Sequence, residues 1–350
     1  MPARVSVIVP VFNKRGTLPR TIQSIVAQQG IPAEIVVVDD GSTDGSLDSL
    51  QPAATLRCLW QPNSGVAAAR NLGIAAATGE YIAFLDADDY WLPGFLEQTI
   101  AFLEEHPECG AVSTAFYTYD GNCTALVPAP GGNDGETLRT AVIADFFGTY
   151  ARLQHVWTGA VLARRSLIDK AGPMRADLPV AEDIEYWLRI GTMATWGFVD
   201  QPLAVYDRTD PTSLTRISAP RGLLPDIELW QRDIVPRLQP EHMPGFLEFR
   251  RSMARTMTLN LLTRGRPDEA RKAAQFAFAG SSDWLGRILW RLRPAPVIVW
   301  RLTGWAMTAA LVARIALRRL LDRERGAGPS DGPSAFGGPV PPRIGPEAPN

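Results

Sequence analysis

The stretch AFLDADDYW, residues 83–91, brings three carboxylates to the end of a hydrophobic run. Asp86, Asp88 and Asp89 follow directly after apolar residues 81–85. Like charges this close repel one another unless a cation compensates them. Mg²⁺ and Mn²⁺ prefer oxygen ligands, and Mg²⁺ commonly combines one or two carboxylates with substrate phosphates. The stretch therefore predicts a site for a divalent cation and a diphosphate.

Two other uses of these carboxylates fit the sequence less well. A calcium-binding loop needs glycine at its sixth position, where this stretch has Trp91. A phosphatase-type Asp-x-Asp nucleophile is expected on the first strand of its sheet, and residues 4–11 contain no aspartate.

Two further groups lie where a bound nucleotide could reach them. Asp39 begins the segment DDGSTDGS, which is typical of a turn after a strand but could also place a carboxylate against a base or ribose. Arg70 lies in the alanine-rich segment 65–79, which predicts a helix. Its side chain is either a solvated surface charge or a cation near a phosphate or near Asp86.

The segment AEDIEYWLRI, residues 181–190, combines an apolar helical face with acidic residues at its start. The purely structural interpretation is an amphipathic helix whose first-turn carboxylates are stabilised by the helix dipole. The acidic residues are Glu182, Asp183 and Glu185.

The elements around these residues predict an α/β fold. Short runs rich in Val and Ile alternate with helical patterns of ten to fifteen residues, which indicates a doubly wound sheet. Ligands bind such sheets beyond the carboxyl ends of the strands, where the aspartates stand. We expect strands near 4–11, 34–39, 55–60 and 80–85, and helices near 17–29, 65–79 and 92–107.

Four segments in this order resemble family 2 glycosyltransferases. They are VSVIVPVFNKRGTLPRTIQSIVAQ, EIVVVDDGSTDGS, NSGVAAARNLGIAAATGEYIAFLDADD and VAEDIEYWLRI, and the resemblance covers about residues 4–215. The family has the GT-A fold, a Rossmann-like mixed sheet. Its members are inverting, metal-dependent enzymes that use nucleotide sugars, so the resemblance implies a glycosyltransferase with Mn²⁺ or Mg²⁺ as cofactor.

The resemblance also implies roles for individual residues. Asp183 is the catalytic base, Asp88 is the first choice for the metal ligand, and Asp86 contacts both the ribose and the metal. The role of Asp89 stays open. The other residues expected to bind the nucleotide sugar are Pro10, Val11, Asn13, Asp39, Arg70 and Arg208.

An acceptor site is expected near the segment VWTGAVLARRSLIDKAG. Trp157, which could stack on a sugar or belong to the core, and Glu182 are its candidates. The segment LAVYDRTDPTSLTR, residues 203–216, resembles the closing segment of the family through Tyr206, Arg208 and Ser213. The histidine that often follows the arginine is missing, so the contact of this segment with the diphosphate is open.

The rest of the chain predicts a helical appendage. We expect a catalytic domain over 1–215, a helical subdomain over 216–282, and a disordered tail over 326–350, where 13 of 25 residues are Gly or Pro. Residues 283–325 are basic and rich in Trp and Arg. They fit either a contact with an anionic membrane surface or a helical subdomain packed on the catalytic domain.

Composition limits the remaining possibilities. The chain has 350 residues, 21% of them charged, and a formal net charge of −2, which argues against a nucleic-acid partner. Three cysteines and the lack of a signal-peptide pattern favour a cytoplasmic location, with peripheral attachment to the inner face of the membrane left open.

The expected partners are a nucleotide-sugar donor, with UDP favoured, and a glycan or lipid-linked acceptor. The alternative is a non-catalytic module of the same fold that binds nucleotide sugars or acts as a scaffold.

Overall fold

A computed structural model gives the structure of the protein. It describes residues 4–31, 33–51, 53–121, 124–128, 137–210, 213, 227–277, 291 and 303. The chain divides into two compact units, Met1–Ala254 and Arg255–Asn350. The domain boundaries expected at 215, 282 and 325 lie outside the described residues, as does nearly all of the basic segment 283–325.

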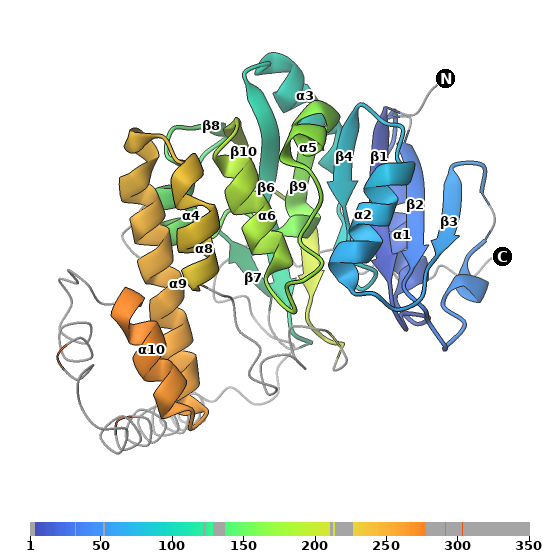
Figure 1. Cartoon of the computed structure of the whole chain (residues 1–350). Helices are drawn as coiled ribbons and strands as arrows, with labels where there is room; N and C mark the ends of the chain where they lie inside the picture. Colours follow the sequence, from blue (N-terminus) through green and yellow to red (C-terminus); the bar gives the residue numbers. More distant parts are fainter. Residues whose placement is uncertain are drawn as a thin grey trace, which may run out of the picture. The chain divides into compact units, whose positions relative to one another are not determined.

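One mixed sheet of ten strands forms the centre of the first unit (Figure 1). Its strand order is β3-β2-β1-β4-β9-β6-β10-β5, with β7 paired to β6 and β8 paired to β10. β3, β2, β1 and β4 are parallel, β9 runs antiparallel to its neighbours β4 and β6, and β10 is parallel to β6. This arrangement confirms the predicted mixed α/β fold. The strands are β1 (Val5–Val11), β2 (Ala33–Asp39), β3 (Leu56–Trp60), β4 (Tyr81–Phe84), β5 (Tyr90–Trp91), β6 (Cys109–Tyr119), β7 (Thr124–Val127), β8 (Ala141–Ile143), β9 (Val161–Arg164) and β10 (Thr195–Asp207).

Helices cover the sheet, and α2, α5 and α6 lie in front of it in Figure 1. Gly73 brings α2 close to the sheet, because a Cβ atom there would stand 2.4 Å from the Ile8 side chain of β1. The helices of this unit are α1 (Leu18–Val26), α2 (Val66–Ala76), α3 (Phe95–Glu105), α4 (Phe146–Leu153), α5 (Arg165–Ala171), α6 (Glu182–Gly191) and α8 (Ile227–Asp233).

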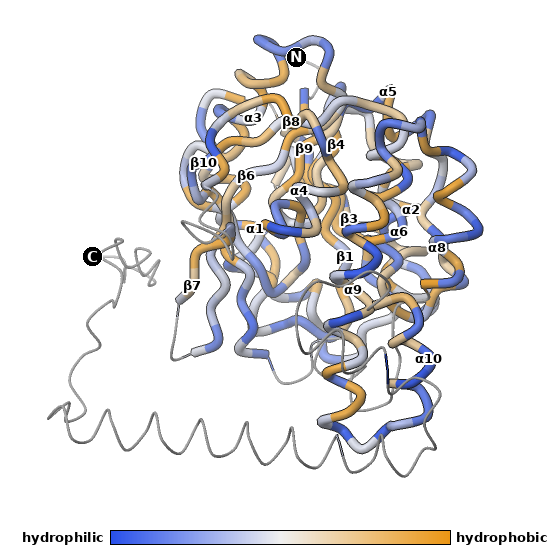
Figure 2. The backbone as a smooth tube through the Cα atoms, turned by 90° about the vertical axis from the view of Figure 1, so that its left-hand side faces the viewer, coloured by the Kyte–Doolittle hydropathy of each residue, from blue (hydrophilic) through white to orange (hydrophobic). Residues whose placement is uncertain are grey.

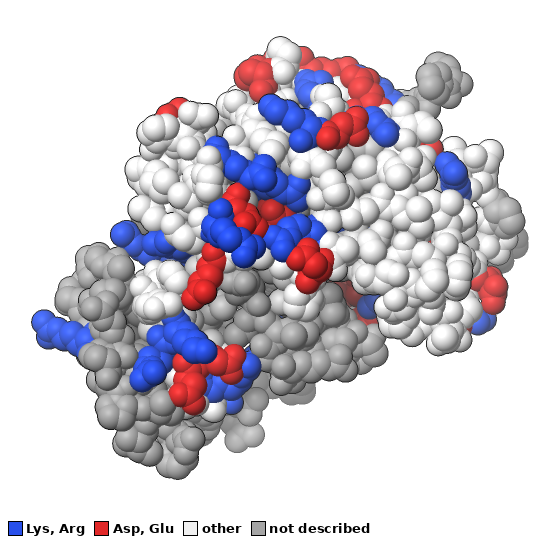
Figure 3. All heavy atoms as spheres, viewed as in Figure 1, with Lys and Arg blue, Asp and Glu red and all other residues white. Residues whose placement is uncertain are grey.

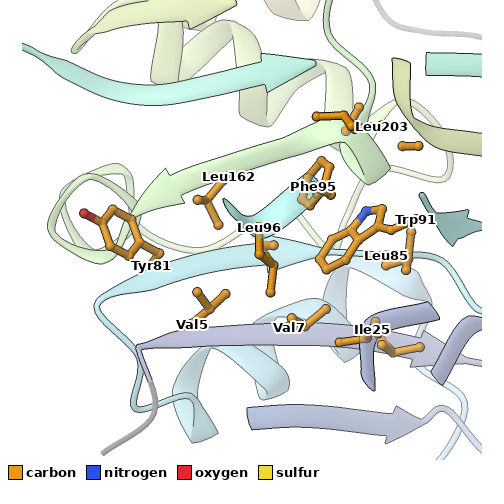
Figure 4. Packing of buried hydrophobic residues seen from close by; sticks show 14 of the residues in the cluster. Val5, Val7, Ile25, Tyr81, Leu85, Trp91, Phe95, Leu96, Leu162 and Leu203 are labelled. Carbon is orange, nitrogen blue, oxygen red and sulfur yellow. The ribbon is translucent and has the colours of Figure 1, made fainter. Parts of the chain in front are cut away.

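The main core lies between the sheet and the helices α1 and α3. All seven residues of β1 are buried, as expected for a central parallel strand that is covered on both faces. Figure 4 shows Trp91 and Phe95 beside Leu85 in this core, and their rings stack with centroids 4.1 Å apart. Figure 2 shows the same hydrophobic character along β4, β6 and β9. The acidic stretch 86–89 therefore begins where a rigid, buried strand ends.

The loop before α6 is held from two sides. The side-chain amide of Asn71 on α2 both donates to the Met174 carbonyl and accepts from the Met174 N–H, each at 2.8 Å. Arg175 pairs with Asp233 of α8 at 2.6 Å and with Asp177. Figure 3 shows clustered charges of both signs on this face of the molecule. These contacts fix the point at which α6, and Asp183 within it, begins.

The second unit contains the end of α9 (Met243–Thr263), which starts in the first unit, and α10 (Pro267–Ala277). Gly265 lies between these two helices with φ +71°, a left-handed conformation that glycine adopts readily. No helix in the described part of the chain is long and apolar enough to cross a membrane.

Candidate active site

Asp39 and Asp40 end the second strand with different contacts. Asp39, the last residue of β2, is 6% exposed and accepts the Ser42 N–H at 2.8 Å. Asp40 accepts the backbone N–H groups of Ser64 and Gly65 at 2.8 and 2.9 Å. Asp40 thus fixes the loop that leads into α2, while Asp39 stands at the strand end where the resemblance expects a nucleotide.

The end of β1 is tied to the same loop. Pro10 and Val11 are buried, and their neighbour Asn13 adopts a left-handed backbone conformation with φ 54°. Asn13 accepts the Thr43 N–H at 2.8 Å and donates its own N–H to the Ser42 hydroxyl at 2.9 Å. Asn13 therefore holds the segment after Asp39 against the end of the first strand.

Arg70 connects the two acidic segments of the site. Its guanidinium donates to Asp86 Oδ1 at 2.7 Å and to Glu182 Oε1 at 2.9 Å, and its side chain is 3% exposed. Burial alone would lower the pKa of Arg70, but the carboxylates of Asp86, Glu182 and Asp183 raise it above its usual value. Arg70 is therefore a permanent buried cation between β4 and α6.

Asp88 faces a lysine that the sequence reasoning did not single out. Lys14 Nζ lies 2.7 Å from Asp88 Oδ2 and 2.5 Å from Asp210 Oδ2. The Lys14 side chain is 14% exposed, so water screens these pairs only weakly. Burial and the neighbouring Asp86 raise the pKa of Asp88, while Lys14 opposes that rise. Asp210 stands near the position where the resemblance leads one to expect histidine, and it shares Lys14 with Asp88.

Asp89 points away from solvent and has a different environment from its two neighbours. Its side chain is fully buried, and Oδ1 accepts the backbone N–H of Asp207 at 2.8 Å. Burial raises the pKa of Asp89 well above its usual range, and the charges of Asp88 and Asp86 add to this. Asp89 therefore joins the acidic stretch to the end of β10.

Asp183 lies in the first turn of α6 and is half-buried. Its Oδ2 accepts a hydrogen bond from the Thr158 hydroxyl at 3.0 Å, and its Oδ1 accepts one from the Ile184 N–H at 2.8 Å. Thr158 in turn accepts the indole N–H of Trp187 at 3.0 Å. Each carboxylate oxygen has two lone pairs, so both oxygens of Asp183 keep capacity for a further hydrogen bond.

Glu182 precedes Asp183 but is directed toward the interior. It is 6% exposed, and Arg70 is its partner. Burial and the adjacent Asp183 raise the pKa of Glu182 to about 7, while Arg70 lowers it. Glu182 was expected as a residue of the acceptor site, and in the structure its carboxylate forms an ion pair with Arg70.

The two remaining candidates lie near β10. The Trp157 ring stacks on Tyr206 with centroids 5.1 Å apart and tilts against Phe116 at 4.9 Å, so much of its surface is packed. Arg208 is exposed, and its backbone N–H donates to the Tyr119 carbonyl at 2.7 Å. Tyr206, on which Trp157 stacks, and Arg208 flank Asp207, whose backbone N–H donates to Asp89.

The carboxylates suit a metal held jointly with a substrate. No cluster of three or more potential metal-ligating side chains occurs among the residues that the structure describes. Asp86 gives one oxygen to Arg70 and Asp88 gives one to Lys14, which leaves each a second oxygen. Two carboxylates completed by phosphate oxygens are a common magnesium site, so the donor set fits such an ion.

Comparison with known proteins decides the family. Residues 6–170 match the family model described as Glycosyl transferase family 2. This chain belongs to that family over residues 6–170. It is 40% identical over 106 residues to the putative teichuronic acid biosynthesis glycosyltransferase TuaG of Bacillus subtilis, which covers 29% of this chain and 42% of that protein. The match with another relative, the uncharacterized glycosyltransferase alr2836 of Nostoc sp., covers 49% of this chain and 54% of that protein.

Two solved structures share the fold of this chain. One is S. aureus TarS 1-349 in complex with UDP-GlcNAc, with a TM-score of 0.52, 19% identity, and coverage of 78% of this chain and 88% of that chain. The other is the mannosyltransferase PcManGT from Pyrobaculum calidifontis in complex with GDP-Man and Mn²⁺. Its TM-score is 0.51, its identity 20%, and the match covers 90% of this chain and 89% of that chain.

Proposed function

We propose that this chain is an inverting glycosyltransferase that moves a sugar from a nucleotide-sugar donor to a glycan or lipid-linked acceptor. UDP is the favoured nucleotide. The name of the relative TuaG supports a cell-envelope polysaccharide as the acceptor class. The UDP-GlcNAc complex of TarS and the GDP-Man complex of PcManGT support a nucleotide-sugar donor.

The ion pairs of Arg70 carry this proposal. One guanidinium contacts Asp86, which follows β4, and Glu182, which adjoins Asp183 on α6. Inversion at an anomeric carbon needs a base on the side opposite the departing diphosphate. By binding Glu182, Arg70 holds the first turn of α6, which carries the proposed base Asp183, beside the carboxylates that can serve the donor.

The proposed reaction is a single displacement. Asp183 takes the proton of an acceptor hydroxyl, whose oxygen attacks the anomeric carbon while the bond from that carbon to the diphosphate oxygen breaks. Asp39 is proposed to hydrogen-bond the base or ribose. Asp86 and Asp88 would hold Mn²⁺ or Mg²⁺ together with the diphosphate. The bound ion would offset the charge that develops on the leaving diphosphate.

A panel of UDP- and GDP-sugars with Mn²⁺ or Mg²⁺ tests the proposal, with release of nucleoside diphosphate as the measurement. We expect the wild-type protein to release nucleoside diphosphate from one of these donors. Asp183→Asn should still bind that donor but should not release nucleoside diphosphate from it. Asp169→Asn, at an exposed position on α5, is the control and should behave as wild type. Nucleotide binding without release by wild type would favour the non-catalytic alternative, and equal release by Asp183→Asn would remove the assigned base.

A further inference from the structure

Three side chains form a hydrogen-bonded chain that ends on Asp183. The Trp187 indole N–H donates to Thr158 Oγ1 at 3.0 Å, and the Thr158 hydroxyl donates to Asp183 Oδ2 at 3.0 Å. Thr158 and Trp187 are each 1% exposed. Water therefore does not compete for these two bonds, although Asp183 itself is half-buried.

The chemistry of the three groups fixes the direction of this chain. An indole nitrogen can only donate, so Trp187 uses one acceptor site of the threonine oxygen. The hydroxyl has a single proton, and Asp183 is the acceptor that it faces. Trp187 thus orients the hydroxyl of Thr158 as a donor to the carboxylate.

We propose that Thr158 and Trp187 are positioning residues that set the orientation of Asp183. This inference rests on the proposed function, in which Asp183 is the base. The Thr158 hydrogen bond stabilises the ionised carboxylate and holds it in one rotamer, ready to take a proton. The bond uses only one lone pair of Asp183 Oδ2, so other lone pairs of the carboxylate can accept the proton of the acceptor hydroxyl.

Trp187 also relates the base to the donor side of the site. Its ring packs edge-on against Phe84 with centroids 6.1 Å apart and against Trp196 at 5.8 Å. Phe84 is the last residue of β4, two positions before Asp86. The same side chain that orients Thr158 therefore fixes α6 against the strand that carries the donor carboxylates.

Thr158→Val tests the first bond because valine keeps the shape of threonine but cannot donate. We expect kcat for nucleotide release to fall by about 10- to 100-fold. This is the change in rate that corresponds to the free energy of a hydrogen bond to a charged group. The Kd for UDP should not change.

Two more variants separate positioning from a general structural effect. Thr158→Ser keeps the hydroxyl and should recover most of the wild-type kcat. Trp187→Phe removes the indole donor and should reduce kcat by about 2- to 10-fold. In the double variant Thr158→Val/Trp187→Phe, the second change should add little to the first, because the chain is already broken.

Thr99→Val is the matched control. Thr99 is fully buried on α3, and its hydroxyl donates to the Phe95 carbonyl at 2.6 Å, away from Asp183. It should keep the wild-type kcat. UDP-GlcNAc and GDP-mannose are the donor probes, used with Mn²⁺.

The outcomes distinguish the two proposals. If Asp183→Asn is inactive but Thr158→Val keeps the wild-type kcat, this inference is wrong and the proposed function stands. Strictly additive losses in the double variant would also overturn it. If Asp183→Asn releases nucleotide as fast as wild type, the assigned base is wrong and this inference fails with it.

Discussion

Replacing Arg70 by methionine should strongly destabilise the first unit. The side chain is 3% exposed and makes two charge-assisted hydrogen bonds, to Asp86 at 2.7 Å and to Glu182 at 2.9 Å. Methionine fills a similar volume but leaves both carboxylates without their cation. Removing one partner from a buried ion pair costs roughly 3–5 kcal/mol, because the other charge stays buried.

The two carboxylates should not share this cost equally. The Asp86 side chain is 35% exposed, so water can solvate it when Arg70 is removed. The Glu182 side chain is only 8% exposed and cannot be solvated in the same way. We therefore expect Glu182→Gln to restore part of the lost stability, about 1–2 kcal/mol, in an Arg70→Met background. Asp86→Asn should restore less.

The effect should also depend on pH. Burial and Asp183 already raise the pKa of Glu182, and Arg70 is the group that lowers it. Without Arg70 the pKa rises further above its unfolded value. The folded state then binds more protons than the unfolded state, so the variant loses stability as pH rises through that window. Arg70→Met should be closer to wild type at pH 5 than at pH 8.

Urea unfolding followed by circular dichroism measures these differences. Arg57→Met is the control, because Arg57 is an exposed arginine on the edge strand β3 and should change the free energy of unfolding by less than about 0.5 kcal/mol. A loss below about 1 kcal/mol for Arg70→Met would refute the reasoning. So would a failure of Glu182→Gln to restore stability in its background.

Three further outcomes are expected. Burial lowers the pKa of His155 to about 3, below its unfolded value, so wild type should lose stability as pH falls below about 6.5, and His155→Leu should remove that component from urea unfolding curves. Parallel pH curves for the two proteins would contradict this. Gly73→Ala places a Cβ atom 2.4 Å from the Ile8 side chain and should lower the free energy of unfolding in urea by about 1–3 kcal/mol. No measurable loss would mean that α2 can shift away from the sheet. Asp88→Asn should weaken the binding of UDP in the presence of Mn²⁺, as measured by calorimetry. An unchanged Kd would exclude Asp88 as a ligand of the metal ion.

The sequence predicted the first half of the fold well because its signals are local. The run of Val and Ile in β1 and the helical spacing of α1 each lie within a single element, and both are confirmed. β10 was not predicted. Its 13 residues contain Pro202 and several register shifts against β6, which interrupt the alternation that marks a strand.

The contacts of the site depend on residues far apart in the sequence. Lys14 meets Asp88 and Asp210, and Thr158 meets Asp183, and no spacing within a segment indicates either pairing. The acidic residues could be found because they stand at strand and helix ends. Their partners could not, because only the folded sheet brings them together.

The amide of Asn71 holds the backbone of Met174 rather than its side chain, and this has a consequence for protein engineering. A contact with N–H and C=O groups constrains the path of the loop but places little demand on the identity of its residues. Pro173, Ala176 and Pro179 in this loop are exposed. A library randomised at these three positions, with Asn71 retained, could vary the surface beside α6 while leaving the start of that helix in place.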